Sequence, residues 1–221
     1  DPGLFSHDTK PDTTDVLTVQ TVDTTGTLGT VTMNADGSFS YDPNGQFESL
    51  AVGETALDTF SYVVTDSNGG TDTATVTLTI TGVNDGPTAV ADGYGTDEDT
   101  VLNVGAGTGL VSNDTDPDTT DVLTVQSVDT TGTLGTVTMN ADGSFSYDPN
   151  GQFESLAVGE TALDTFSYVV TDSNGGTDTA TVTLTPTGGH HPPNAPQHGH
   201  GPHQHPTPKR ATTPAHVTPP R

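Results

Sequence analysis

A near-identical internal repeat constrains this chain more than any other feature. Residues 12–79 recur 106 positions later as residues 118–185, and the two copies differ only at Thr21 against Ser127. A period near 100 residues is too long for a solenoid unit, but it matches the size of one self-sufficient β-sandwich. The sequence therefore predicts tandem copies of a single domain that fold alike.

The match between the copies extends upstream only loosely, from Gly3 against Gly109, so the first copy lacks a counterpart of residues 87–108. The composition changes abruptly at Gly188, where the acidic residues end and His, Pro and Thr dominate. We therefore expect three parts: an N-terminally truncated sandwich repeat at 1–83, a complete repeat at 84–187, and a disordered His- and Pro-rich tail at 188–221.

Apolar residues within each copy alternate with polar ones at a period of two, which is typical of half-buried strands. The clearest runs are 73–80 and 60–65, and residues 30–41 predict a hairpin with its turn at Asn34–Gly37. Residues 44–57 fit a strand poorly and are expected to form a loop that crosses between sheets. Two short strands are expected in the second copy, at 88–90 and 101–104.

About seven strands in 100 residues, without a helical period, favour an all-β fold. The expected architecture is a tandem Greek-key β-sandwich of the cadherin or immunoglobulin-like kind.

Charge excludes several classes of function. The chain holds 29 acidic and 4 basic residues, and none of the basic ones lies between Pro11 and Pro208. Such a body repels nucleic acid and anionic membranes and attracts divalent cations. No apolar run is long enough to cross a membrane. Because the chain has no Cys and no His from Pro11 to Thr187, no nucleophile–histidine site can be built there, and we expect no enzymatic activity and no catalytic residues.

Acidic residues gather in three short motifs. Asn113–Asp118 places carboxylates at every second position, Asp97–Asp99 forms a second cluster, and Val83–Pro87 joins the two copies. Further acids lie near predicted strand ends, at Asp58 and Asp172. Any single one of these acids is explained by ordinary turn chemistry. The set as a whole, with no nearby cation, matches the six to eight oxygen ligands that Ca²⁺ requires.

Several of these motifs resemble cadherin-like repeats of large bacterial surface proteins, the VCBS-type and related extender modules of RTX-type adhesins. Asn84–Pro87 is similar to the cadherin linker, and DTDPD at Asp114–Asp118 to its D-x-D loop. Thr171–Gly175 resembles the strand-end motif A-x-D-x-G, and Leu57–Asp58 matches the acidic motif before the sixth strand. The resemblance covers most of residues 3–187.

In such arrays calcium lies at the junctions between domains. Carried over by motif, the resemblance implies these metal ligands: Asp58, Asn84, Asp85, Asp114, Asp116, Asp118 and Asp172. A second set, Glu98 and Asp99 with Asp164, would belong to a junction after the second copy. We expect that site to be weak, because TPTGGHHPP stands where TITGVNDGP would continue the pattern. The first copy's own upstream site is expected to be lost, since His7 and Lys10 replace Asn113 and Asp116.

The tail holds seven of the eight histidines. It is expected to be a disordered extension, with a zinc or copper site and a non-native end of the coding sequence as alternatives.

The function favoured by these features is a calcium-rigidified structural extender of a secreted or cell-surface adhesin, acting in cell adhesion and biofilms. Its expected partners are neighbouring repeats, other copies of itself, or surface ligands reached through other modules. One alternative is an extracellular filament subunit completed by strand donation, because the first copy leaves a sheet edge that another chain's strand could fill. Another is a carbohydrate-binding sandwich.

Overall fold

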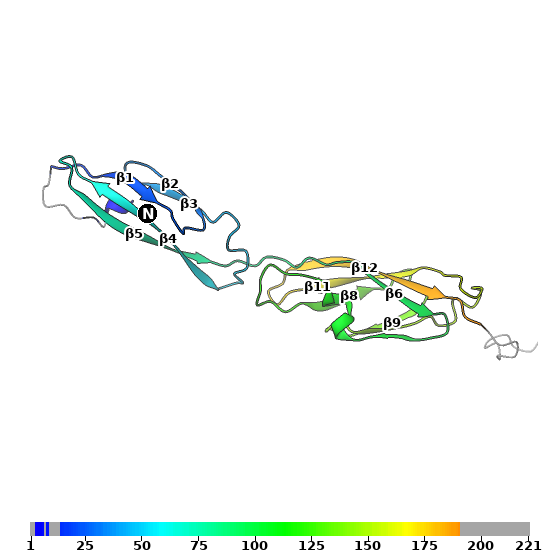
Figure 1. Ribbon diagram of the computed structural model, residues 1–221. Helices are drawn as coiled ribbons and strands as arrows, with labels where there is room; N and C mark the ends of the chain where they lie inside the picture. The colour runs from blue at the N-terminus through cyan, green and yellow to red at the C-terminus, as the bar shows by residue number, and fades with distance from the viewer. Residues whose placement is uncertain (1–2, 7, 9–13, 191–221) are drawn as a thin grey trace, which may run out of the picture. The chain divides into compact units, whose positions relative to one another are not determined.

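A computed structural model describes residues 3–6, 8 and 14–190. Its residues 84–187, called repeat 2 below, form a two-layered β-sandwich that contains seven strands within the described residues (Figure 1). These strands are β6 (Asp92–Asp97), β7 (Leu102–Val104), β8 (Thr124–Asp129), β9 (Thr136–Met139), β10 (Phe145–Asp148), β11 (Asp164–Thr171) and β12 (Thr177–Thr187). Two short 3-10 turns, η2 (Ala106–Thr108) and η3 (Leu110–Ser112), precede β8. No helix in the described part is long and apolar enough to cross a membrane.

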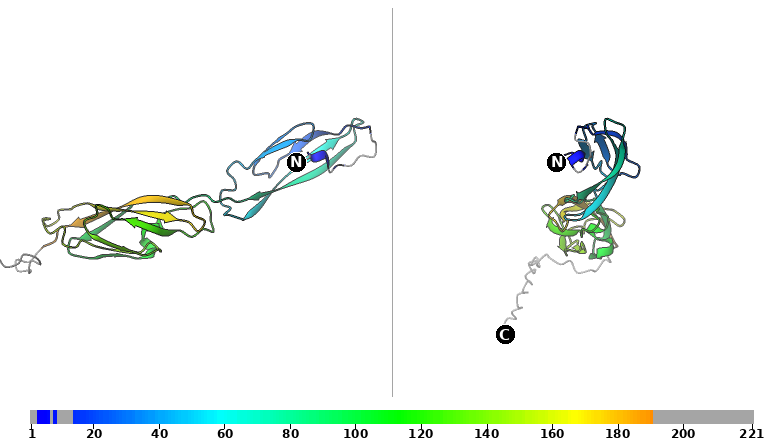
Figure 2. Two further views of the ribbon diagram at one scale, coloured as in Figure 1. Left: turned by 180° about the vertical axis from the view of Figure 1, so that it is seen from behind. Right: turned by 90° about the vertical axis from the view of Figure 1, so that its left-hand side faces the viewer.

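The two sheets of repeat 2 are ordered β6-β12-β11-β8 and β7-β10-β9. All pairings are antiparallel except β6 with β12, the first and last strands, which run parallel from Asp92 opposite Val182 to Asp97 opposite Thr187. Figure 2 shows the two sheets facing each other, and alternate residues of their strands meet between them. The core is closed and dense, because Leu110, Tyr147 and Val182 have no exposed surface.

Residues 3–82, called repeat 1, contain a smaller arrangement. The short turn η1 (Leu4–Ser6) precedes a sheet ordered β1-β4-β5, and a separate hairpin pairs β2 with β3. The strand bounds are β1 (Thr18–Asp23), β2 (Thr30–Met33), β3 (Phe39–Asp42), β4 (Thr55–Thr65) and β5 (Thr71–Thr81). The described residues of repeat 1 contain no counterpart of β6 or β7.

The absence of these two strands changes burial at equivalent positions. Val182 and Leu184 of β12 are completely buried, whereas their counterparts Val76 and Leu78 of β5 are only half-buried. The two copies are nearly identical in sequence, so the difference arises from what packs against them.

The predicted all-β sandwich is confirmed, and the hairpin at 30–41 forms with its turn at Asn34–Gly37. Two local predictions are wrong. Residues 55–57 were expected in a loop, but they extend β4 and pair with β5. In residues 88–90 only Thr88 makes a ladder contact, an isolated bridge to Thr115, and the strand in this region is β6 instead.

The predicted tail begins at residue 188, and its residues from 191 onwards lie outside the described part of the chain.

Candidate metal centre

Three carboxylates converge in the loop between η3 and β8. Asp116, Asp118 and Asp121 each offer an oxygen, and these oxygens lie within 4.8 Å of one another. A tight turn brings the last two together, because the Asp121 N–H donates to the Asp118 carbonyl at 3.1 Å. The Asp118 N–H in turn donates to Asp116 Oδ1 at 2.9 Å, which fixes the spacing of the first two.

The linker segment 84–86 is bound to this loop and to the turn between β11 and β12. The Asp85 N–H donates to Asp118 Oδ2 at 3.0 Å, and Asn84 Nδ2 donates to Asp172 Oδ2 at 3.0 Å. A glycine makes this approach possible, since a Cβ on Gly176 would overlap Asp172 Oδ2 and lie 3.0 Å from Gly86 Cα. Five of the seven predicted ligands, Asn84, Asp85, Asp116, Asp118 and Asp172, therefore belong to one connected cluster.

Asp172 is held as a carboxylate by the turn that carries it. Burial acts to raise its pKa, but Asn84 and the N–H groups of Asn174, Gly175 and Gly176 outweigh that effect and hold the pKa below its usual range. Asp172 is therefore charged at neutral pH, although only 5 % of its surface is exposed.

Three buried oxygens in the cluster lack a hydrogen-bond partner. They are Asn84 Oδ1, Asp116 Oδ2 and Asp118 Oδ1. Buried polar atoms are nearly always satisfied, so such a set requires a physical explanation. The pKa of Asp116 is raised, first by burial and then by the negative charges of Asp172, Asp118 and Asp121.

The donor set fits a hard divalent cation. All of its unpaired atoms are carboxylate or amide oxygens, which are the ligands that Ca²⁺ takes in proteins, and nitrogen and sulfur ligands are absent from the described cluster. No Lys or Arg occurs between residues 14 and 190 to neutralise these carboxylates. Asn84, Asp116, Asp118, Asp121 and Asp172 are the side chains that would hold the ion.

Asp114 was predicted as a ligand but lies in a different environment. Its Oδ1 accepts from the Val90 N–H at 2.7 Å, and both its oxygens lie 3.1 Å from the Tyr168 hydroxyl. Asp92 belongs to the same group, and burial, together with the charge of Asp114, raises the pKa of Asp92 to about 6. The side chain of Asp114 therefore anchors the entry of the linker into repeat 2, apart from the cluster around Asp118.

Asp58 also lies outside this cluster, because the structure assigns it a local role in repeat 1. It accepts from the N–H groups of Leu28 and Gly29 and from the Tyr41 hydroxyl at 2.7 Å. The equivalent carboxylate of repeat 2, Asp164, makes the same bonds, including one from the Tyr147 hydroxyl at 2.7 Å.

Burial acts to raise the pKa of Asp164, but these donors together hold it below its usual value. Both aspartates are thus saturated by protein donors, Asp58 within β4 and Asp164 at the start of β11.

All three residues of the second predicted set are described. Glu98 is 1 % exposed and its Oε1 accepts from the Gly189 N–H at 2.6 Å, while Asp99 is exposed and Asp164 is bonded as described above. The prediction that this site is weak remains untested. The first copy was also predicted to lose its upstream site because of His7 and Lys10, and both of these residues lie outside the described part of the chain.

Sequence analysis missed Asp121 as a member of the cluster. The available signal was the segment DTTD at 118–121, because a four-residue turn brings its first and last side chains together.

Comparison with known proteins gives consistent results. A family model of the bacterial cadherin-like domain matches residues 1–82 and 84–188. The calcium-binding lectin RapA2 of Rhizobium johnstonii is 31% identical over 174 residues, a match that covers 72% of each chain.

Solved structures with similarity include the EC1-4 region of Drosophila N-cadherin and the EC1-2 region of human mucin-like protocadherin. The first is 16% identical with a TM-score of 0.47, over 82% of this chain and 44% of that structure. The second is 16% identical with a TM-score of 0.45, over 79% and 85%.

Proposed function

This chain belongs to the bacterial cadherin-like domain family, and we propose that it is a calcium-rigidified structural segment of a secreted or cell-surface adhesin. The observation that carries this proposal is the set of three buried, unpaired oxygens on Asn84, Asp116 and Asp118. Bound Ca²⁺ supplies the positive charge and the coordination that these oxygens lack. The name of the relative RapA2, a calcium-binding lectin, supports the choice of metal.

The protein groups prepare the site before any ion enters. Asp172 is kept ionised by its turn, and the Asp118 side chain is oriented by the Asp85 N–H. Because Asn84 and Asp85 form the linker segment at the start of repeat 2, an ion shared between Asn84 and the carboxylates of residues 116–172 would fix this segment to the body of the repeat. The segment would then resist bending at residues 84–86, which suits an extender that presents other modules at a distance.

Calcium sites of extracellular modules have dissociation constants of about 10⁻⁴ to 10⁻³ M. At roughly 10 mM calcium, one such site would stabilise the folded state by about 1.4 to 2.7 kcal/mol. This is a substantial part of the roughly 5 to 15 kcal/mol that stabilises a typical domain.

The direct test is a thermal melt of the full chain in calcium, in magnesium and in chelator, combined with a calorimetric titration. We expect calcium to raise the melting temperature of repeat 2 more than magnesium does, because magnesium demands a stricter octahedral geometry. Asp118→Asn should abolish most of the calcium-dependent shift. Asp142→Asn is the matched control, because Asp142 lies in an exposed hairpin turn and accepts only from Ser144.

Equal melting curves in calcium and chelator would contradict the proposal. Small-angle scattering of the full chain gives a second measurement, in which chelation should broaden the distribution of particle lengths. A distribution that stays the same would argue against stiffening of the linker, even where calcium binds.

A carbohydrate-binding role is the second candidate, and the similarity to a lectin favours it. None of the twelve aromatic residues, all of which are described, is fully exposed, and only Phe5, Phe39, Tyr41 and Tyr94 are half-buried, so the described surface offers few rings on which a sugar could stack. Sugar binding would therefore have to use calcium and polar groups. A glycan array probed in calcium and in chelator tests this role, and calcium-dependent binding of one glycan class would support it.

A further inference from the structure

A buried group of oxygen atoms surrounds the Tyr168 hydroxyl in repeat 2. The nearest acceptors are the Leu110 carbonyl at 2.9 Å, both carboxylate oxygens of Asp114 at 3.1 Å and the Val90 carbonyl at 3.3 Å. Tyr168 is 1 % exposed, and its hydroxyl carries a single proton to donate. The group therefore contains more acceptors than this hydroxyl can satisfy.

Asp92, the first residue of β6, adds a second carboxylate to the group. Its Oδ2 atom is buried and has no hydrogen-bond partner, and its Oδ1 atom lies 3.4 Å from the Tyr94 hydroxyl. That hydroxyl donates at a shorter distance, 2.9 Å, to the Thr108 carbonyl. Burial, and then the charges of Asp92 and Asp114, raise the pKa of the Tyr168 hydroxyl, so both carboxylates face a tyrosine that keeps its proton.

The backbone and amide donors near the group are already used. The Val90 N–H donates to Asp114 Oδ1 at 2.7 Å, and Asn113 Nδ2 donates to the Val90 carbonyl at 3.4 Å. Neither of them reaches the buried Oδ2 atom of Asp92. Buried acceptors are nearly always satisfied, so this oxygen requires a donor from another source.

The charged groups around Asp92 are all negative. No Lys, Arg or His occurs between residues 14 and 189, and the charge of Asp178 acts on Asp114 from the start of β12. Burial, and then the charge of Asp114, raise the pKa of Asp92 to about 6. The titratable groups that face this site from β6, β11, β12 and the loop before β8 are Tyr94, Tyr168, Asp178 and Asp114.

We propose that Asp92 is a proton-dependent latch, which holds residues 88–92, the segment that follows the linker, on the loop 110–114. With its proton, the Asp92 carboxyl group supplies the donor that the oxygens around Tyr168 lack. Without the proton, Asp92 and Asp114 repel each other, and the segment opens more readily.

Three backbone N–H groups report on the closed state of this latch. The Thr88 N–H donates to the Thr115 carbonyl at 2.7 Å, and the Thr115 N–H donates to the Thr88 carbonyl at 3.1 Å. The third is the Val90 N–H, which donates to Asp114. All three bonds join the segment to the loop, so they break together when the segment opens.

The sign of the pH dependence follows from the raised pKa of Asp92. A carboxyl group with a raised folded-state pKa destabilises the closed form as pH rises from its free value of about 3.9 to its folded value of about 6. If opening brings Asp92 into water, the equilibrium constant for opening should rise roughly fiftyfold between pH 4 and pH 7. The segment is therefore held most firmly in acid and released at neutral pH.

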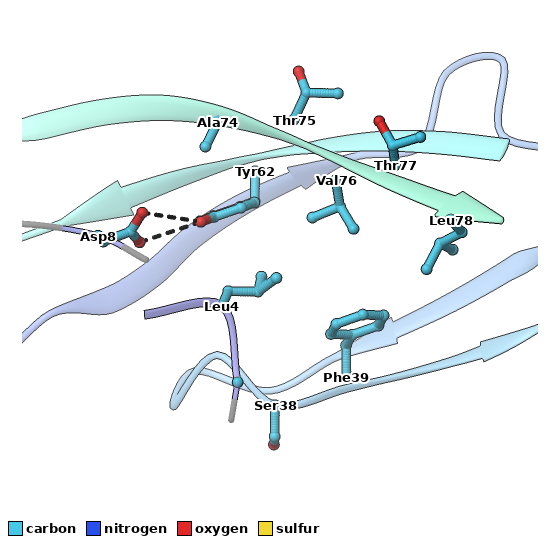
Figure 3. Close-up of a pocket in the computed structure, with 11 residues that line it drawn as sticks. Leu4, Asp8, Ser38, Phe39, Tyr62, Ala74, Thr75, Val76, Thr77 and Leu78 are labelled. Atoms are coloured by element: carbon cyan, nitrogen blue, oxygen red, sulfur yellow. Dashed lines mark hydrogen bonds between the residues drawn. The ribbon is translucent and has the colours of Figure 1, made fainter. Parts of the chain in front are cut away.

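Repeat 1 provides an internal reference. Figure 3 shows the Tyr62 hydroxyl bonded to both oxygens of Asp8, each at 3.2 Å, and these residues are the counterparts of Tyr168 and Asp114. Burial, and then the charge of Asp8, raise the pKa of Tyr62, and no second carboxylate in the described part of repeat 1 acts on it. A change caused by Asp92 should therefore appear at Tyr168 and not at Tyr62.

The test is a nuclear magnetic resonance titration of the full chain from pH 4 to pH 8 in chelator, with amide hydrogen exchange measured on the same samples. We expect the Asp92 carboxyl group to titrate at about pH 6 and the Tyr168 ring signals to shift with the same midpoint. The protection factors of the Thr88, Val90 and Thr115 amides should fall roughly fiftyfold from pH 4 to pH 7.

Asp92→Asn separates the latch from the charge of the whole chain, because its amide donates at every pH and so imitates the protonated carboxyl group. Protection in this variant should stay high at pH 7. Asp97→Asn, at the exposed other end of β6, is the matched control and should retain the full pH dependence. A repeat of the titration in roughly 10 mM calcium should leave the Asp92 midpoint unchanged, because the latch holds a proton and not a metal ion.

Three results would overturn the proposal. They are an Asp92 midpoint at the ordinary value of about 4, an undiminished pH dependence in Asp92→Asn, and a midpoint that falls in calcium, which would place a cation in the group. Failure here would leave the calcium proposal unaffected, because that proposal is tested by the chelator-dependent melt of the chain and of its Asp118→Asn variant.

Discussion

Replacing Tyr147 by phenylalanine removes a single oxygen from the buried group around Asp164. The Tyr147 hydroxyl donates to Asp164 Oδ2 at 2.7 Å, and neither residue has more than 4 % of its surface exposed. The same carboxylate oxygen keeps its bond from the Gly135 N–H at 2.9 Å, so the substitution deletes one hydrogen bond without orphaning the charge.

A hydrogen bond to a charged group contributes about 1.5 to 3 kcal/mol to stability. For a domain of about 100 residues, each kcal/mol corresponds to a shift of roughly 4 to 8 °C in the melting temperature. We therefore expect Tyr147→Phe to lower the melting transition of repeat 2 by roughly 6 °C or more at pH 7.

Differential scanning calorimetry measures this shift, and the matched variant is Tyr41→Phe. Tyr41 makes the same 2.7 Å bond to Asp58 in repeat 1, but its ring is half-buried, so water can replace the lost partner. The loss in repeat 1 should be smaller. Each of the two shifts should be the same in calcium as in chelator, because protein donors already saturate these carboxylates.

The pH dependence follows from the depressed pKa of Asp164. A carboxylate with a depressed folded-state pKa stabilises the protein above its unfolded pKa of about 3.9, and this contribution is lost as pH falls through the folded pKa. The effect of Tyr147→Phe should therefore shrink in acid. An unchanged melting temperature at pH 7, or a shift that appears only with calcium, would refute the structural role assigned to Asp164.

Three further changes probe burial, ionisation and the linker. Asp92→Asn should raise the melting temperature at pH 7 and lose most of this effect by pH 4, because a folded-state pKa of about 6 makes the carboxylate destabilising from its unfolded pKa of about 3.9 upwards, and fully so above about pH 6. An equal effect at pH 7 and pH 4, measured by calorimetry, would contradict this. Leu184→Ala should lower the free energy of unfolding, measured in denaturant, by about 2 to 5 kcal/mol. The same substitution at its half-buried counterpart, Leu78→Ala, should lower it by less than half as much. Equal losses would show that β6 does not bury this part of the core. Gly176→Ala should lower calcium affinity and destabilise repeat 2 by about 1 to 3 kcal/mol. Gly70→Ala in repeat 1 should have a smaller effect, because the added Cβ meets only the movable carboxylate of Asp66. A calcium titration in which the two variants behave alike would argue against close packing of the linker.

Much of the β-sandwich could be predicted from the local alternation of apolar and polar residues and from turn residues. The hairpin of β2 and β3 was predictable because its arms alternate and its turn ends in Gly37, whose φ is +80°. The strand β6 was not, because its residues 92–97 include two glycines and two aspartates, which are depleted in strands. Its position depends on the neighbouring β12, which fixes an unfavourable sequence in extended form through tertiary contact.

The site was predictable to a similar extent. The acidic loop and the linker pointed to Asp116, Asp118 and Asn84 before any geometry was known. Spacing alone could not show that Asp114, two residues earlier, turns toward Tyr168. The direction of each side chain depends on the path of the loop, which is fixed by contacts with β11 that no local pattern encodes.

The parallel pairing of β6 with β12 has a mechanical consequence. These are the first and last strands of repeat 2, and their shared direction means that the chain enters and leaves the pair at opposite ends. Traction along the polypeptide then acts in shear on the whole ladder from Asp92 to Asp97, whose rungs must rupture together. A module joined in this way resists pulling through its backbone ladder before its side-chain core is disturbed, as the proposed structural segment would require.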